Sequence, residues 1–175
     1  MPAVLPKWSL NLLQMKKNKP KLSFRRAVEQ TPEVQNCYQP GLGAFKNYST
    51  KIELADQAKC GGSLNIDGCL SAQKMYPRGN RWDYALEYEA EVYFIEVHSA
   101  YTSEVSTVLK KLQWLKDWLQ KQAPEIIKLR AKKQPYYWIQ SGKFGILPHA
   151  SQYRKAAQAS ILPIPKLVLP RPSGK

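Results

Sequence analysis

The sequence RWDYALEYEAEVYFIEVHSA, residues 81–100, contains two extended runs joined by a short polar link. The runs, 81–88 and 92–98, are rich in aromatic and β-branched residues, which favour β-strands. Only residues 89–91 separate them, so a β-hairpin is the most economical interpretation. We expect the rest of the fold to be organised around this hairpin.

Polar residues near the end of the second run stand out against their apolar surroundings. Side chains alternate between the two faces of a strand, so Glu96 and His98 share a face with Val92 and Phe94. The opposite face is aromatic and β-branched, which predicts a strand that is buried on both faces. A carboxylate and an imidazole are costly to desolvate there, so we expect them to have a partner or a function.

Net charge is the strongest global feature of the 175-residue chain. It has 27 Lys and Arg against 13 Asp and Glu, a formal charge of +14, and a hydrophobic content of 43% that is typical of a globular protein. The length predicts a single domain. Excess positive charge attracts polyanions, so nucleic acid is the leading partner. A membrane surface is the weaker alternative, because no amphipathic helix pairs a wholly basic face with a lipid-seeking one. No apolar run approaches the ~20 residues that span a bilayer.

The cysteines and the first residues of the chain predict the cellular compartment of the protein. Cys37, Cys60 and Cys69 are an odd number without a C-x-x-C pair. This pattern predicts free thiols in a reducing compartment and no zinc site. The first residues lack a basic region ahead of an apolar core, so we expect no secretory signal and a cytoplasmic location.

Composition divides the chain into a basic arm at 1–21, a single domain at 22–160 and a proline-rich segment at 161–175. Ser23 is placed to cap a short helix that ends near Gln30. Proline is confined to sheet edges, so we expect the last segment to be a tail or an edge segment.

Periodicity and turn residues predict the remaining elements. An amphipathic helix is expected from Thr102 or Ser103 to about Gln122, with an apolar stripe facing the sheet. Lys116 falls inside this stripe, where it either extends its stem over apolar surface or has a functional role. The other predicted elements are helices at 44–59, 124–133 and 150–160, and strands at 63–71 and 135–141. The helix at 44–59 is expected to end at Gly61 and Gly62, the strand at 63–71 to bend near Asp67, and a turn is expected at Gly142 and Lys143.

The predicted order is helix, strand, strand, strand, helix, strand, with Asp83 on the second strand and Glu96-x-His98 on the third, 13 residues later. The chain thereby resembles the PD-(D/E)xK nuclease superfamily over residues 44–141. That family has an α-β-β-β-α-β core, with an acid on the second strand and Glu-x-Lys on the third. The resemblance implies an α/β fold of the restriction-endonuclease type, a mixed sheet flanked by helices.

The resemblance also implies a site. Asp83 matches the first acid and Glu96 the second, and together they would hold Mg²⁺ or Mn²⁺ through hard oxygen ligands. Such an ion polarises the scissile phosphate and lowers the pKa of a bound water. Glu53 is the candidate for an additional acid from the first helix, and Asp67 is an alternative acid.

One position departs from the family pattern. His98 stands where the family has lysine, and its imidazole can act as a base or a donor near pH 7. Lys116 or Lys110 on the following helix would be candidates for a displaced lysine. The alternative is structural: Asp83 would pair with Arg81 or Arg78, and His98 would be an ordinary core histidine.

The function implied by the resemblance is metal-dependent cleavage of phosphodiesters in DNA, with Asp83, Glu96 and His98 as catalytic residues. The alternative is a catalytically inactive nucleic-acid-binding subunit of a larger complex, and a protein partner or a homodimer stays open. Basic residues on helices would hold the nucleic-acid backbone. These are Lys110, Lys111, Lys128, Arg130, Lys132, Lys133, Arg154 and Lys155.

Overall fold

The computed structural model describes residues 21–171. The predicted basic arm at 1–21 therefore lies outside the described residues, apart from Lys21. Among the helices in the described part of the chain, none combines the length and the apolarity that crossing a bilayer requires.

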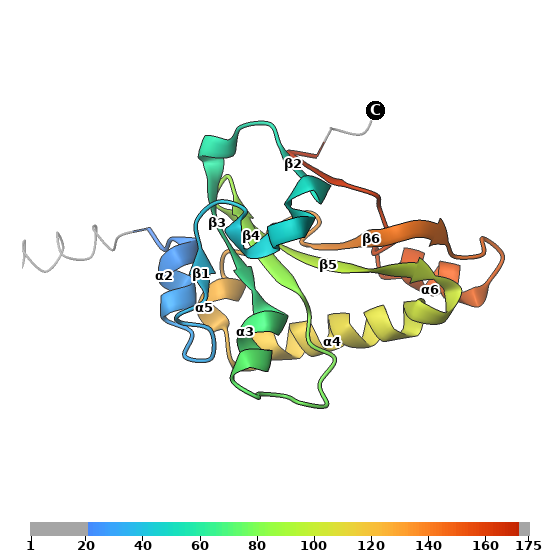
Figure 1. Ribbon diagram of the computed structural model, residues 1–175, viewed down its shortest axis with the longest axis horizontal. Coiled ribbons are helices and arrows are strands. Elements are labelled where there is room, and N and C mark those ends of the chain that lie inside the picture. Colours follow the sequence, from blue (N-terminus) through green and yellow to red (C-terminus); the bar gives the residue numbers. More distant parts are fainter. Residues whose placement is uncertain (1–20, 172–175) are drawn as a thin grey trace, which may run out of the picture.

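A mixed five-stranded sheet forms the centre of the described fold (Figure 1). The first four strands pair antiparallel with their neighbours, whereas the last two are parallel. Helices flank the sheet, so the predicted α/β class is confirmed. The strand order is β1 (Tyr38–Gln39), β3 (Cys60–Asn65), β4 (Tyr84–Tyr88), β5 (Glu91–Tyr101) and β6 (Tyr136–Gly145).

The predicted hairpin is confirmed as β4 and β5, which pair antiparallel from Tyr84 opposite Ile95 to Tyr88 opposite Glu91. The two turn residues, Glu89 and Ala90, both have positive φ, 52° and 64°. This is the backbone geometry of two-residue turns that match the twist of paired strands. Strand β5 is buried on both of its faces, as predicted.

Helix α4 (Val105–Lys121) connects β5 to β6 and packs on one face of the sheet. Parallel neighbours require such a crossover. The predicted extent is confirmed, but the predicted side-chain cap is not, because Thr102 and Ser103 lie in a preceding 3-10 turn, η3 (Thr102–Glu104). The apolar stripe packs inward: Val105, Val108, Leu112, Leu115 and Leu119 are buried and Leu109 is half-buried.

Two apolar clusters lie on opposite faces of the sheet. The first, on the face that α4 covers, also includes α2 (Phe24–Glu29), α3 (Ile66–Ala72), α5 (Pro124–Ile127) and α6 (Ser151–Gln158). The second lies between the other face and η1 (Gly43–Lys51), β2 (Ile52–Leu54) and β7 (Leu167–Leu169). In Figure 1, α4 runs beneath the sheet and β2 lies above it.

The helix predicted at 44–59 is wrong. Lys46 interrupts η1 with φ 48°, and the segment continues as β2 and a short 3-10 turn, η2 (Gln57–Lys59). Strand β2 forms because it pairs in parallel with β7, more than 100 residues later, and local spacing does not report such a partner. Gly61 and Gly62 also lie inside β3 rather than ending a helix. A Cβ at Gly62 would meet the Tyr38 ring at 2.4 Å, so this glycine permits close approach.

Three other predicted elements end at a different residue or take a different form in the structure. The strand at 63–71 stops at Asn65, whose side chain accepts a hydrogen bond from the Gly68 N–H at 2.7 Å and begins α3. The helix at 124–133 stops at Ile127, because Arg130 forms a β-bridge with Val92. The turn at Gly142 and Lys143 is instead a register shift within β6. Helix α2 with its Ser23 cap and helix α6 agree with prediction.

Residues 161–171 pack onto the domain as an edge segment. Strand β7 pairs with β2, and its Leu167 and Leu169 are buried in the second cluster. An isolated bridge between Ile164 and Ile139 also attaches the segment to the open edge of β6.

The free-thiol prediction is wrong for two of the three cysteines. Cys37 and Cys69 form a disulfide with a Cα–Cα distance of 6.1 Å, and Cys60 is the remaining thiol. The bonded pair is separated by 32 residues and is brought together by α3 packing beside the loop that follows α2. Sequence spacing alone does not indicate this contact.

Candidate functional site

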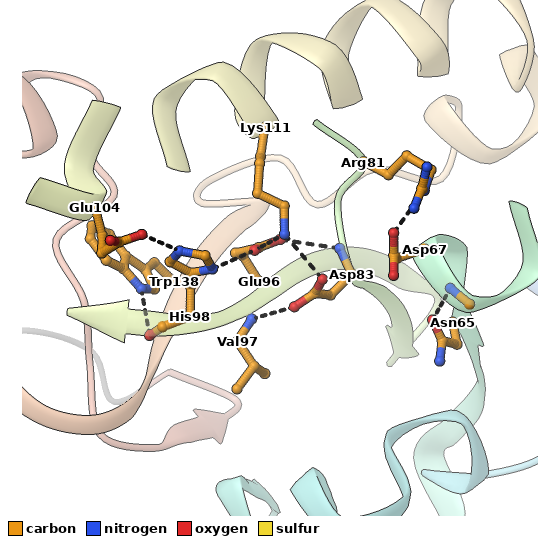
Figure 2. A network of polar contacts seen from close by, with 11 residues as sticks. Asn65, Asp67, Arg81, Asp83, Glu96, Val97, His98, Glu104, Lys111 and Trp138 are labelled. Carbon is orange, nitrogen blue, oxygen red and sulfur yellow. Dashed lines mark hydrogen bonds and ion pairs between the residues drawn. The ribbon is translucent and has the colours of Figure 1, made fainter. Parts of the chain in front are cut away.

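Two carboxylates, Asp83 and Glu96, converge on the ammonium group of Lys111 (Figure 2). Lys111 Nζ lies 3.2 Å from Asp83 Oδ1 and forms an ion pair with Glu96 Oε1. Three elements supply the cluster: Asp83 immediately precedes β4, Glu96 lies on β5, and Lys111 lies on α4. The predicted meeting of Asp83 and Glu96 therefore occurs, with a lysine that the sequence analysis assigned to the nucleic-acid backbone.

Backbone hydrogen bonds orient both carboxylates. The Val97 N–H donates to Asp83 Oδ2 at 3.0 Å, and the Asp83 N–H donates to Glu96 Oε2 at 3.2 Å. The pairing of β4 with β5 therefore fixes one oxygen of each carboxylate. The other two oxygens, Asp83 Oδ1 and Glu96 Oε1, are the ones that face Lys111.

The cluster lies at the boundary between core and solvent. The Glu96 side chain is fully buried, whereas Lys111 and Asp83 keep 14% and 19% of their side-chain surface exposed. Solvent can therefore reach Asp83 and Lys111, which a site acting on an external ligand requires.

The charges of the cluster perturb its titration. Burial, reinforced by the negative charge of Glu96, raises the pKa of Asp83 to about 6, although Lys111 and the Val97 N–H oppose the shift. Burial disfavours the charge on Lys111, but the two carboxylates outweigh it and raise the pKa of this ammonium. Lys111 is therefore charged at neutral pH, and Asp83 titrates close to neutral pH.

His98 links the cluster to the start of α4. Its Nδ1 lies 3.5 Å from Glu96 Oε1, and its Nε2 lies 2.8 Å from Glu104 Oε2. The hydrogen bond with Glu96, together with that of Glu104, raises the pKa of His98 against the effect of burial. An imidazolium can donate to both carboxylates at once, whereas a neutral imidazole can donate to only one. The geometry therefore favours a positively charged His98.

These shifts predict how stability depends on pH. The folded pKa of Asp83 lies above its unfolded value, so its contribution to stability is complete below pH ~4 and is lost as the pH rises through about 6. His98, whose pKa is also raised, loses its contribution as the pH rises past its ordinary value of about 6.5. We expect the free energy of unfolding of wild type, relative to Asp83→Asn, to fall by on the order of 2 kcal/mol between pH 4 and pH 7. Urea unfolding at a series of pH values measures this, and a flat difference would contradict the Asp83 shift.

Other acids nominated from the sequence do not join the cluster. Glu53 is exposed on β2 and pairs with Lys166 at 2.8 Å. Asp67 lies on α3 and pairs with Arg81 at 2.7 Å, so Arg81 is not the partner of Asp83. Asp67 approaches Asp83 through the backbone, where its N–H donates to the Asp83 carbonyl at 3.4 Å.

The two lysines considered as displaced catalytic lysines lie elsewhere. Lys110 is exposed. Lys116 Nζ lies 5.3 Å from the centroid of the Tyr136 ring, on β6. Lys111, by contrast, follows Val108 by three residues and precedes Leu115 by four, so it borders the apolar stripe. This position in the sequence indicates that the Lys111 side chain can be directed towards the sheet.

Most of the remaining basic residues face solvent. Lys132 and Lys133 are exposed after α5, and Arg154 and Lys155 are exposed on α6. Lys128 forms an ion pair with Glu125, and Arg130 is exposed. In Figure 1, α5 and α6 lie towards opposite ends of α4, so these basic residues form two separate groups.

The donor set suits a hard cation only in part. Within residues 21–171, no group of three or more His, Cys, Asp or Glu side chains is arranged to hold a metal ion. Asp83 and Glu96 offer two carboxylates facing one point, and Mg²⁺ is often bound by one or two carboxylates with waters and substrate phosphates. Asp83 and Glu96 therefore supply two of the oxygen ligands that Mg²⁺ takes, at a point where the Lys111 ammonium group lies in this structure.

Comparison of the chain with protein-family models, curated proteins and solved structures found no match.

Proposed function

We propose that this protein is a metal-dependent nuclease of the PD-(D/E)xK kind that cleaves phosphodiesters in DNA. The observation that carries the proposal is the convergence of Asp83, Glu96 and Lys111 at one point. These are an aspartate, a glutamate and a lysine, the residue types of the motif. The lysine comes from α4 and replaces the one missing at His98.

The order of elements supports the same proposal. Elements α2, β3, β4, β5, α4 and β6 occur in the order helix, strand, strand, strand, helix, strand. Other elements are interspersed: β1, η1, β2 and η2 before β3, α3 after it, η3 before α4 and α5 before β6. The first helix is α2 rather than the segment at 44–59. Asp83 immediately precedes β4 and Glu96 lies on β5, the antiparallel neighbour of β4, as in the family arrangement.

Each residue has a chemical role in this proposal. Asp83 and Glu96 would hold the metal, which would polarise the phosphate and lower the pKa of a water. Lys111 would turn its ammonium group from the carboxylates towards the phosphate and offset the negative charge of the phosphate. His98, held between Glu96 and Glu104, would keep the Glu96 carboxylate in position.

Cleavage of supercoiled plasmid DNA tests the proposal. We expect wild-type protein to nick or linearise plasmid with Mg²⁺ or Mn²⁺ and to stop when EDTA is added. Protein of verified fold that gives no cleavage with either metal, over a range of pH above 6, would refute the catalytic proposal.

A second candidate function is nucleic-acid binding without catalysis. The observation in its favour is that Lys111 already compensates both carboxylates in the absence of a metal, so the cluster can be purely structural. Binding of DNA with no cleavage under any of the conditions above would support this candidate.

Both candidates predict salt-sensitive binding to DNA. The charge of +14 and the exposed lysines after α5 favour contacts with phosphates, which release counterions. For about five phosphate contacts, we expect affinity to fall by roughly 10²–10³-fold between 50 and 200 mM salt. Fluorescence anisotropy measures this, and Lys132→Gln with Lys133→Gln should reduce the slope. An affinity that does not change with salt would exclude binding through phosphates.

A further inference from the structure

A cavity of about 270 Å³ lies beside α4, away from the cluster of Asp83, Glu96 and Lys111. It is lined by Lys116 and Gln120 of α4, Ile127 of α5, Arg130, and Tyr136 of β6. Lys111 and Lys116 are five residues apart, so their side chains leave the helix about 140° apart around its axis. The cavity is therefore separate from the site formed by Asp83 and Glu96.

The lining of this cavity is positively charged. It contains Lys116 and Arg130 and no acidic residue. Within the described part of the chain, neither of these cations forms an ion pair with a carboxylate. Two cations that share a cavity repel one another, and an anion placed between them would remove that cost.

One of the lining residues, Tyr136, also carries a polar group without a partner. The Tyr136 hydroxyl is buried and has no hydrogen-bond partner, although a buried hydroxyl normally has one. The ring is held in place between Lys116 and Phe94, whose ring centroid is 5.8 Å away. Gln120 adds an amide with two further donors.

From these features we infer that the cavity lined by Lys116, Gln120, Arg130 and Tyr136 is a binding site for a phosphate group. An arginine beside a lysine provides the fork of donors and the compact charge with which proteins bind phosphate. The cavity volume accommodates a single phosphate with its waters. The inference is independent of the chemistry proposed for Asp83 and Glu96, because neither residue lines the cavity.

Calorimetric titration with inorganic phosphate tests the inference, with chloride at equal ionic strength as the reference. We expect saturable binding to wild type. Lys116→Met and Arg130→Gln should each raise the apparent Kd by about tenfold or more, because each removes a charged hydrogen-bond donor. Lys143→Met is the matched control, since it removes the same charge from an exposed position outside the cavity. Absence of saturable binding, or an equal loss in Lys143→Met, would overturn the inference.

A competition experiment identifies whether the bound phosphate belongs to a DNA backbone or to a small molecule. A DNA oligonucleotide without terminal phosphates should displace inorganic phosphate if the site takes a backbone phosphate, and Lys116→Met should then weaken oligonucleotide binding more than Lys143→Met does. Phosphate binding that the oligonucleotide does not affect assigns the site to a free or small phosphorylated molecule. In both cases the phosphate site itself stands.

Discussion

Glu96→Gln is expected to abolish metal-dependent cleavage of DNA, lowering the rate by roughly 10³-fold or more. The substitution keeps the shape of the side chain but removes the negative charge that would hold the metal. Glu53→Gln is the matched control, because Glu53 is exposed on β2 and pairs with Lys166. We expect its activity to equal that of wild type in the same plasmid assay.

The same substitution has a defined effect on stability. If the two carboxylates had no counter-charge, loss of one of them would relieve its repulsion with the other and raise stability. The position of Lys111 reverses this sign, since Glu96→Gln leaves Lys111 paired only with Asp83 and His98 paired only with Glu104. We expect the free energy of unfolding to fall by about 3 kcal/mol. If Glu96→Gln cleaves DNA as fast as wild type and is equally stable, Glu96 neither holds the metal nor stabilises the cluster.

Lys111→Met is expected to destabilise the protein by about 3–5 kcal/mol near pH 8 and to remove cleavage. The substitution leaves Asp83 and Glu96 side by side, with Glu96 fully buried and with His98 as the remaining positively charged group in contact with it. Lys110→Met, one residue away, is the matched control, because Lys110 is exposed and its loss should leave melting temperature and cleavage unchanged.

Two further measurements separate this explanation from a simple packing defect. The loss in Lys111→Met should shrink as the pH falls, because protonation of Asp83 removes the repulsion, and without Lys111 this protonation occurs at a higher pH than in wild type, where the pKa of Asp83 is about 6. Mg²⁺ should raise the melting temperature of Lys111→Met more than that of wild type, because the cation can take the place of the ammonium. A destabilisation that neither acid nor Mg²⁺ relieves would indicate lost packing instead.

The part of the site on β4 and β5 could be predicted because its determinants are local. The two extended runs and the short link at 89–91 define the hairpin, and alternation along β5 places Glu96 and His98 on the face that α4 covers. The separation of Asp83 from Glu96 then brings the two acids together.

The remaining features depend on contacts between distant segments. A lysine bordering an apolar stripe can point to solvent or to the sheet, and only the packing of α4 shows that Lys111 points to the carboxylates rather than to a nucleic-acid backbone. Strand β2 was taken for a helix because its partner, β7, lies far along the chain. The Cys37–Cys69 bond was missed for the same reason.

The pairing of β2 with β7 has a consequence for the order of folding. The cluster between these strands and the sheet contains Ile52 and Leu54 together with Leu167 and Leu169. Its two halves close a loop of more than 100 residues, and the entropy of that closure must be met before any of these contacts stabilise the chain. During synthesis, one face of the sheet therefore stays open until residue 169 has emerged, whereas the hairpin and α4 on the other face can form earlier.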